Sequence, residues 1–445
     1  MTSRSAALRA AWALGLAAVL AGCDSTFFGK PEGPPLPGER ISVLKMGTQL
    51  VPDEALASLQ VRLPRPWRNT DWPQAGGYTG HAMHHLALPD DLKVAWRADI
   101  GTSASRDQRM VNDPVVADSR IFTIDAGSRL SAFSVADGKR LWSEDLTPEE
   151  EEADLFGGGL GYWQGTLYVT TPYAKVLALD PANGERRWEV SLPAPMHAPP
   201  TISDGRVFVQ TVDDHLFVLA ADDGRQLWDY EGVSEPTTLL GGPSPAVLGT
   251  VAVVAFSSGE VFAFQVETGR VLWSESLGGA GLVPGSASTL SDIRGSPVID
   301  RDLVFAASYA GTLAALDLRR GGRAWDAGIG SAQQPWVAGD YLYVLTNDAE
   351  LVCMRRTDGR IRWVTQLPRF QDPEEKSGPI YWSGPVLGGD RLIVTSSAAE
   401  AYSVSPYTGA ILGRFELPAR TFLPPIIADG TLYFLSDDAE LIALR

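Results

Sequence analysis

One phrase recurs along the chain and constrains its fold more than any other feature. The clearest copy, residues 259–273, reads as an apolar strand, a tight turn ending at Gly269, and a second strand with Trp273 four residues after that glycine. Five other copies keep both glycine and tryptophan, and a sixth keeps only the glycine. The glycines recur at intervals of roughly 40 to 50 residues: Gly138, Gly184, Gly224, Gly269, Gly321, Gly359 and Gly409. Self-similarity of this period predicts a propeller or a solenoid.

Each phrase follows another strand pair, which turns at residues such as Asp204-Gly205 or Asp429-Gly430. These residue types supply the positive φ that tight hairpins require. The repeating unit is therefore predicted to contain four antiparallel strands. Eight such first hairpins are found, at residues 114–124, 160–170, 200–210, 245–256, 297–307, 335–345, 385–395 and 424–435.

The two ends of the repeat array complement each other. A third strand, residues 440–444, is the last element of the chain, so the final unit lacks its fourth strand. At the other end, residues 93–97 form a tryptophan-bearing strand with no partners before it. We expect an all-β, eight-bladed β-propeller over residues 72–445, made of four-stranded antiparallel blades and closed by this N-terminal strand. Closure removes the open end that a solenoid must cap.

The repeated tryptophans are predicted to be structural. A large ring at one fixed place per blade suits the wedge between neighbouring blades, where it buries about 150–250 Å². The seventh phrase has Gly413 at this place, so the junction after it is expected to be the loosest. The seven tryptophans are Trp96, Trp142, Trp188, Trp228, Trp273, Trp325 and Trp363.

The first 71 residues predict targeting and tethering. Arg4 and Arg9 precede an apolar run, and residues 20–23, Leu-Ala-Gly-Cys, resemble the lipobox of bacterial lipoproteins. The resemblance implies a signal peptide over residues 1–22 and a lipid on Cys23. Residues 23–71 would form a lipid-anchored tether and N-terminal extension, rich in proline and glycine at first. In some bacteria an aspartate such as Asp24, directly after the lipidated cysteine, implies retention at the inner membrane. The sequence therefore leaves both the inner and the outer membrane as locations for this protein.

Charge and potential ligands exclude several classes of function. The net charge is −17, which argues against nucleic acid as a partner. Cys353 lies in an apolar stretch and is predicted to be a buried hydrophobe. His81, His84 and His85 are close in sequence, but no carboxylate or fourth ligand accompanies them, so no metal site is predicted.

Over residues 72–445 the repeat resembles that of quinoprotein-type β-propellers. One branch of these proteins comprises dehydrogenases that use pyrroloquinoline quinone. The resemblance implies for that branch a vicinal Cys-Cys pair, a Ca²⁺ site and a catalytic aspartate; the two distant cysteines cannot form the pair. We therefore expect no cofactor and no enzymatic activity. A quinone-dependent dehydrogenase or small-molecule-sensing propeller is the main alternative, and a polysaccharide-binding propeller is a third.

The other branch is the BamB family of outer-membrane assembly lipoproteins. Residues 237–245 resemble the family loop that helps contact BamA, and residues 290–297 resemble a second contact loop. The resemblance nominates Leu239, Leu240, Asp292 and Arg294 as partner-binding residues. Leu240 replaces an arginine and Arg294 an aspartate of the better-known members. The simpler alternative is that both are ordinary inter-blade loops, in which Asp292 caps a turn.

This resemblance implies a non-catalytic lipoprotein scaffold of the outer-membrane β-barrel protein assembly (BAM) complex. It would bind the periplasmic domains of BamA and other members of the complex, contact unfolded outer-membrane clients, and help β-barrel proteins insert. The implied location is the periplasmic face of the cell outer membrane, reached through the lipid anchor.

Overall fold

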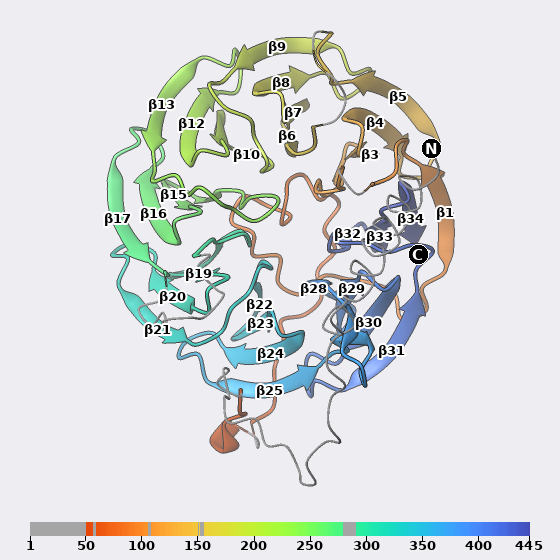
Figure 1. Cartoon of the computed structure of the whole chain (residues 1–445), viewed down its shortest axis with the longest axis vertical. Helices are drawn as coiled ribbons and strands as arrows, with labels where there is room; N and C mark the ends of the chain where they lie inside the picture. The colour runs from red at the N-terminus through yellow and green to blue at the C-terminus, as the bar shows by residue number, and fades with distance from the viewer. Residues whose placement is uncertain (1–49, 57–58, 106–107, 150, 152–154, 279–290) are drawn as a thin grey trace, which may run out of the picture. The chain divides into compact units, whose positions relative to one another are not determined.

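The computed structural model describes residues 50–56, 59–105, 108–149, 151, 155–278 and 291–445. They belong to a compact unit that extends from Leu50 to Arg445. Eight four-stranded antiparallel sheets surround a central axis, with the first strand of each sheet innermost (Figure 1). Within this described part the only helical element is the 3-10 turn η2 (Glu54–Leu56). The predicted all-β, eight-bladed propeller is confirmed.

The blades are numbered here in chain order. Blades 1 to 4 consist of β2 (Val115–Ala117), β3 (Arg120–Ile124), β4 (Arg129–Ser134) and β5 (Arg140–Asp145); β6 (Gly159–Trp163), β7 (Thr166–Thr170), β8 (Lys175–Leu179) and β9 (Arg186–Ser191); β10 (Thr201–Ser203), β11 (Arg206–Gln210), β12 (His215–Ala220) and β13 (Gln226–Glu231); and β14 (Ala246–Leu248), β15 (Val251–Ala255), β16 (Glu260–Gln265) and β17 (Val271–Ser276).

Blades 5 to 8 follow the same order until the last strand. They consist of β18 (Val298–Asp300), β19 (Leu303–Ala307), β20 (Leu313–Asp317) and β21 (Arg323–Ala327); β22 (Trp336–Ala338), β23 (Tyr341–Leu345), β24 (Glu350–Arg355) and β25 (Ile361–Gln366); β28 (Trp382–Gly388), β29 (Arg391–Ser396), β30 (Glu400–Val404) and β31 (Ile411–Glu416); and β32 (Ile426–Ala428), β33 (Thr431–Leu435), β34 (Glu440–Leu444) and β1 (Val94–Asp99).

Blade 8 contains both ends of the repeat array. Strand β1 pairs antiparallel with β34, with Ala98 opposite Leu441 and Asp99 opposite Glu440. The backbones of Lys93 and Arg445 exchange two further hydrogen bonds, 2.8 and 2.9 Å long. The N-terminal strand therefore completes the last blade as expected, and the ring is closed by hydrogen bonds instead of by a chain connection.

The position of a strand in its blade determines its pattern of polarity. The second and third strands, such as β7 and β8, are buried almost throughout because neighbouring blades cover both of their faces. The outermost strands alternate, as in β9, because one face packs inward and the other meets water.

Each outermost strand contains a β-bulge next to the position of the repeated tryptophan. In blade 1, Trp142 lies opposite Ala132 and Arg140 opposite Phe133, which leaves Leu141 as the extra residue. Leu412 has the same place in blade 7. A bulge turns its extra residue away from the regular pairing, and both leucines are about half exposed.

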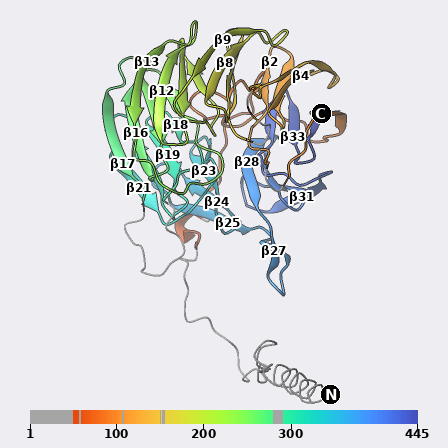
Figure 2. The ribbon, with the colours of Figure 1, turned by 45° about the horizontal axis from the view of Figure 1, so that its top comes forward.

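Two features lie outside the eight blades. A hairpin of β26 (Phe370–Asp372) and β27 (Ser377–Pro379) connects blades 6 and 7 and projects from the body (Figure 2). The described part of residues 50–71, which was expected to belong to the tether and N-terminal extension, contacts the propeller. Asp53 forms an ion pair with Arg360 of 2.6 Å, and Leu56 is buried. The described compact unit thus begins before the boundary expected at residue 72.

Candidate functional site

One end of the propeller axis is crossed by residues 69–88, here called the axial segment (orange in Figure 1). This segment hydrogen-bonds to the innermost strand of every blade, so it acts as a floor that ties the ring together. The bonds, from blade 1 to blade 8, join Trp72 to Val116, Pro73 to Tyr162, Gln74 to Ile202, Thr79 to Val247, Gly80 to Ile299, His84 to Trp336, Leu86 to Leu387 and Asn69 to Ile427.

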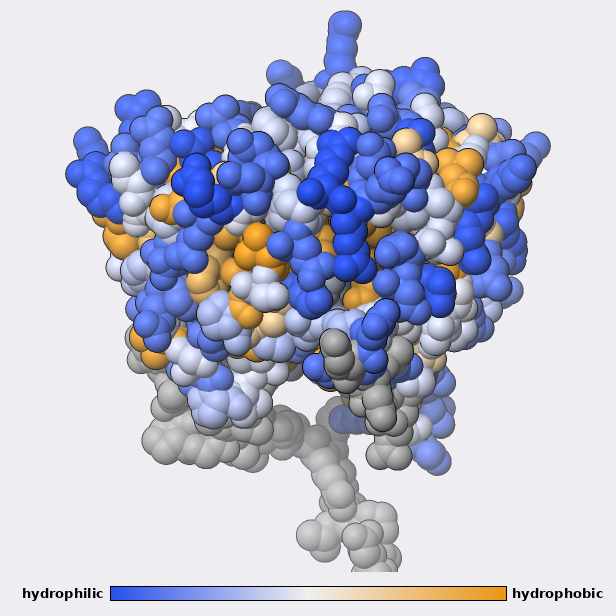
Figure 3. Space-filling view, turned by 90° about the horizontal axis from the view of Figure 1, so that it is seen from above, coloured by the Kyte–Doolittle hydropathy of each residue, from blue (hydrophilic) through white to orange (hydrophobic). Residues whose placement is uncertain are grey.

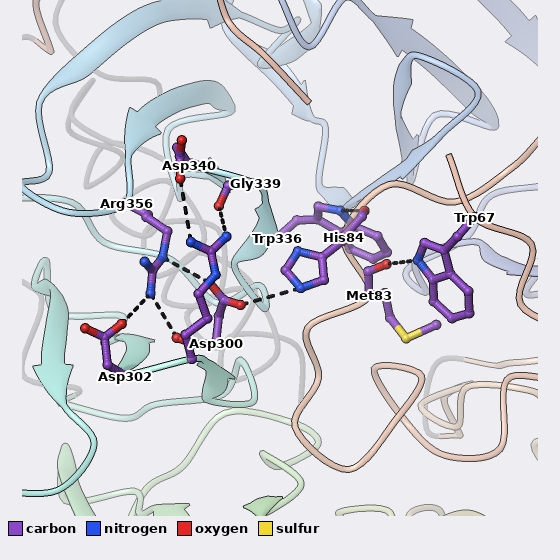
Figure 4. Close-up of polar contacts among 10 residues, drawn as sticks. Trp67, Met83, His84, Asp300, Asp302, Trp336, Gly339, Asp340 and Arg356 are labelled. Atoms are coloured by element: carbon purple, nitrogen blue, oxygen red, sulfur yellow. Dashed lines mark hydrogen bonds and ion pairs between the residues drawn. The ribbon is translucent and has the colours of Figure 1, made fainter. Parts of the chain in front are cut away.

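The axial segment meets blades 5 and 6 at a buried ionic network (Figure 4). The guanidinium Nε of Arg356 lies 3.0 Å from Asp300 Oδ2, and both side chains are about 95% buried. The ring of His84 points toward the same carboxylate, with Nε2 3.5 Å from Asp300 Oδ1. Removing one member of a buried pair leaves an uncompensated charge, which typically costs about 3–5 kcal/mol. The network thus helps to hold the floor in place.

The three neighbouring histidines face different partners. His81 Nδ1 lies 2.7 Å from the Pro297 carbonyl, and His85 Nδ1 lies 2.9 Å from that of Pro64. Burial lowers the pKa of His81 to about 4. Over the residues that the structure describes, no three His, Cys, Asp or Glu side chains gather as metal ligands would.

Above the floor lies an axial cavity of about 110 Å³, lined by Trp72, Gly76, Trp336 and Arg294 among others. Ligand sites for drug-sized molecules usually occupy about 300–1,000 Å³. This cavity by itself lies below that range, although it shares lining residues with a larger neighbour, and Cys353, buried in β24, is the only cysteine among the described residues. The described residues therefore contain no vicinal cysteine pair of the kind that the dehydrogenase branch uses.

The structure brings all four candidate partner-binding residues together at the open end of the axis. The backbone N–H of Leu239 donates to Asp292 Oδ2 at 2.6 Å, and Arg294 Nε donates to the Leu240 carbonyl at 2.6 Å. Arg294 also donates to the Ala332 carbonyl at 3.3 Å. The loop of residues 237–242, here called the apolar loop, is thereby fastened to the loop that precedes blade 5.

Burial governs the charges behind the apolar loop. It raises the pKa of Asp292 to about 6, against the effect of the Leu239 N–H, which favours the ionised carboxylate. Burial also raises the pKa of Asp113 to about 6 and lowers the pKa of the Arg294 guanidinium. Asp292 is 6% exposed, whereas Leu240 is 52% exposed. The two charged residues thus position the loop, and Leu240 is the side chain that it presents to solvent.

A larger cavity of about 480 Å³, here called the mouth cavity, lies beside the apolar loop. Leu239, Leu240 and Arg294 line it, whereas Asp292 lies outside it. The other lining residues are mostly apolar or aromatic, with one more cation, and include Arg109, Met110, Tyr381, Trp382 and Phe422.

The aromatic side of the mouth cavity was not predicted from the sequence. Tyr381 is 59% exposed and packs against Phe422 with ring centroids 6.1 Å apart, and Arg109 lies 5.9 Å from the centre of the Phe422 ring. Tyr381 and Phe422 both lie shortly before the innermost strand of a blade, as Leu239 does. Equivalent loops of successive blades share one rim, so the position of Tyr381 and Phe422 before a first strand is the signal that could have identified them.

The seven repeated tryptophans lie at the blade junctions. Each indole N–H donates to a backbone carbonyl of the next blade at 2.8 to 3.2 Å. Each ring also covers the turn glycine of that blade, so that a Cβ on Gly138 would lie only 2.5 Å from the Trp96 ring. The glycine therefore supplies both a positive φ and room for the neighbouring indole.

Comparison with known proteins identifies the family. A family model described as outer membrane protein assembly factor BamB matches residues 86–155, 149–365 and 369–445. The chain belongs to the BamB family.

Curated relatives agree with this assignment. BamB of Salmonella typhimurium is 26% identical over 356 residues, which cover 79% of this chain and 88% of the relative. BamB of Escherichia coli K12 is 26% identical over 360 residues, with the same shares covered.

Solved structures share the fold. BamB from Moraxella catarrhalis matches with a TM-score of 0.67 and 20% identity, over 80% of this chain and all of that structure. A europium-containing methanol dehydrogenase matches with a TM-score of 0.65 and 13% identity, over 82% of this chain and 89% of the other. The fold of this BamB-family chain is thus also found in that methanol dehydrogenase.

Membrane attachment falls outside the described structure. Within the described ranges, no helix has the length and apolar character needed to cross a membrane. The candidate lipidation site Cys23 and the neighbouring Asp24 precede residue 50, so the anchor and its membrane remain predictions.

Proposed function

We propose that this BamB-family chain is a non-catalytic component of the outer-membrane β-barrel assembly complex, which docks on the periplasmic domains of BamA. The observation that carries the proposal is an exposed leucine, Leu240, beside an apolar cavity of about 480 Å³ at the open end of the propeller. The assembly role itself comes from the family and from its named relatives.

The chemistry of this face suits a protein partner. Interface hot spots are enriched in aromatic residues and arginine and lie in pockets that can be fully desolvated. Tyr381, Trp382 and Phe422 supply the aromatic wall, and Arg109 and Arg294 supply cations. An apolar side chain of BamA would fill the mouth cavity, with Leu240 packed against it.

The hydrogen bonds to the apolar loop hold it in place in the free protein, which favours binding of a partner. Asp292 and Arg294 hold the backbone of Leu239 and Leu240 in place, so little loop entropy is lost on docking. The acid and base of the family contact therefore act here as positioning residues. In this proposal Asp292 and Arg294 hold the apolar loop and do not form ion pairs with BamA.

We also place the chain at the periplasmic face of the outer membrane through a lipid on Cys23, where it would help unfolded barrel proteins reach BamA. The non-catalytic role is supported by the lack of a vicinal cysteine pair among the described residues and by the axial segment, which closes one end of the axis. Pyrroloquinoline quinone added with Ca²⁺ should show no saturable binding. Tight stoichiometric binding would favour the dehydrogenase alternative.

Docking is tested by co-purification of BamA with full-length variants. Leu240→Ala should lower BamA recovery at least tenfold, because loss of a hot spot typically costs about 2 kcal/mol or more. Leu141→Ala is the matched control, since Leu141 is 47% exposed but lies on an outer strand. Asp292→Ala with Arg294→Ala should weaken binding by releasing the loop. Unchanged recovery in both loop variants, with melting near wild type, would exclude this face.

A further inference from the structure

The junction between blades 7 and 8 lacks the rings that fill its counterparts. In six blades the repeated tryptophan faces an aromatic residue of the second strand, as Trp142 faces Phe122. The corresponding residues of blade 7 are Gly413 and Ile393, aligned through Ser403 by the strand register. Two rings are therefore missing from one place.

The other side of this junction differs as well. In the seven tryptophan junctions, the ring lies against a turn glycine of the next blade. Blade 8 has no such turn, because β34 and β1 are paired by hydrogen bonds and no chain connection joins Arg445 to Lys93. Space is thus left on the blade 7 side of the junction, where the two rings are missing, and on the blade 8 side, where the turn is missing.

The result is a cavity of about 390 Å³, here called the junction cavity. Its apolar lining includes Ile393 and Gly413 from blade 7 and Phe434 and Leu444 from blade 8. Phe415 stacks on Phe434 with centroids 6.3 Å apart but is itself 39% exposed, so it covers the cavity incompletely. The volume is within the range of sites that bind small ligands or large side chains.

We propose that the junction cavity binds a tryptophan side chain on an extended segment of a partner protein. Seven sites in the same molecule show what its geometry accepts: an indole on a β-strand, between two blades. The outer edge of β31 has no strand partner in the described sheets, so an incoming segment can lie along it while its indole enters the cavity.

The charges at the mouth of the cavity are balanced, so the indole and not the charge defines the expected segment. Asp90 and Asp91 line the mouth and are exposed, and no ion pair engages either of them among the described contacts. Of the cations there, Arg414 pairs with Glu400 and Arg391 donates to the Asp90 carbonyl. No carboxylate pairs with Arg391 among the described ion pairs, so Arg391 and Lys93 together offset the two aspartates. In three of the seven repeats an arginine lies two residues before the tryptophan, namely Arg140, Arg186 and Arg323.

Exposed apolar residues by themselves would not support this proposal. The side of the body in Figure 3 carries scattered apolar patches among charged side chains, as most protein surfaces do. Leu412 of blade 7 is 54% exposed and Leu141 of blade 1 is 47% exposed, at the same bulge position. The cavity, and not the leucine, distinguishes blade 7.

The first test uses a peptide copied from the chain itself, acetyl-Arg-Arg-Trp-Glu-Val-amide, which reproduces residues 186–190. Calorimetric titration into the purified chain should give saturable 1:1 binding. Replacing its tryptophan with alanine should weaken binding at least tenfold, and free indole should bind at least tenfold more weakly than the peptide. Equal binding of the alanine peptide would overturn the proposal. Indole binding as tight as that of the peptide would also overturn it, in favour of a small aromatic ligand.

Two variants fill the cavity from within the chain. Gly413→Trp and Ile393→Phe should each abolish peptide binding while melting stays at or above that of wild type. If one variant does not fold, the other decides the outcome. Retained binding in a folded variant would contradict the proposal.

The same site can be examined in cells by photo-crosslinking. A photo-reactive residue at Leu412 should crosslink to a discrete protein, and the crosslink should disappear when Gly413→Trp is added. The same residue at Leu141 is the matched control and should give no such product. Identical products at both positions, or a product unaffected by Gly413→Trp, would refute the proposal. None of these measurements depends on Leu240 or on BamA, so the proposed function stands or fails separately.

Discussion

Seven of the eight blade junctions are closed by a tryptophan, and the eighth is not. Between blades 5 and 6, the Trp325 ring is 9% exposed, donates to the Arg356 carbonyl at 2.8 Å and covers Gly359. Between blades 7 and 8, the stack of Phe415 on Phe434 leaves a cavity of about 390 Å³. The tryptophan of one blade and the turn glycine of the next thus form a single packing contact across the junction. Both are absent where the two ends of the repeat array meet.

The largest effect is expected from removing the hydrogen-bonded closure. Deletion of residues 440–445 removes β34, which pairs with both β33 and β1. Two strands of blade 8 then lose their partner, and the ring is open. We expect loss of cooperative unfolding, measured by circular dichroism during heating. A truncated chain that melts at the wild-type temperature would show that closure contributes little.

Removing a junction tryptophan should have the next largest effect. Trp325→Ala should lower the free energy of unfolding by about 3–5 kcal/mol, because it leaves a cavity and an unpaired carbonyl. Phe415→Ala, at the open junction, should cost only about 1 kcal/mol since its ring is 39% exposed. Denaturant titration measures both. Equal losses would mean that the two kinds of junction do not differ in packing.

The contribution of the turn glycine can be tested separately by comparing two glycine-to-alanine variants. A Cβ on Gly359 would lie 2.6 Å from the Trp325 ring, and φ is +68° there. Gly359→Ala should therefore cost about 2–3 kcal/mol. A Cβ on Gly413 would meet nothing closer than Ser403 Oγ at 3.4 Å, so Gly413→Ala should change stability by less than about 0.5 kcal/mol. Similar costs for the two variants would contradict a role for the ring.

The smallest expected effect is a gain. Gly413→Trp restores the missing indole and should stabilise the chain by about 1–2 kcal/mol, a few degrees in melting temperature. The gain is modest because blade 8 has no turn glycine to receive the ring. Val271→Trp is the control. Val271 lies on the outermost strand β17, next to a junction that Trp273 already fills, so this variant should show no gain in stability. A destabilised Gly413→Trp variant would mean that the cavity does not accept an indole in this orientation.

Much of the candidate site could be anticipated, and the remainder shows where sequence reasoning stops. Leu239, Leu240, Asp292 and Arg294 were nominated by family resemblance, and the structure brings them into contact. Their roles were not foreseeable. Asp292 is buried and holds a backbone amide, because the loop before blade 4 folds over the loop before blade 5. Tyr381 and Phe422 join the site from blades 7 and 8, far away in sequence.

The sequence by itself determined the number of blades, their four-stranded form and the closing strand. Each of these follows from local periodicity, turn residues and a count of strands, which need no knowledge of distant contacts. Only the tertiary structure decided what the axial segment and Gly413 do. The axial segment has no internal period, because its hydrogen bonds go one by one to eight different blades. The space at Gly413 is lined by Lys93 and Leu444, which only closure of the ring brings together beside it.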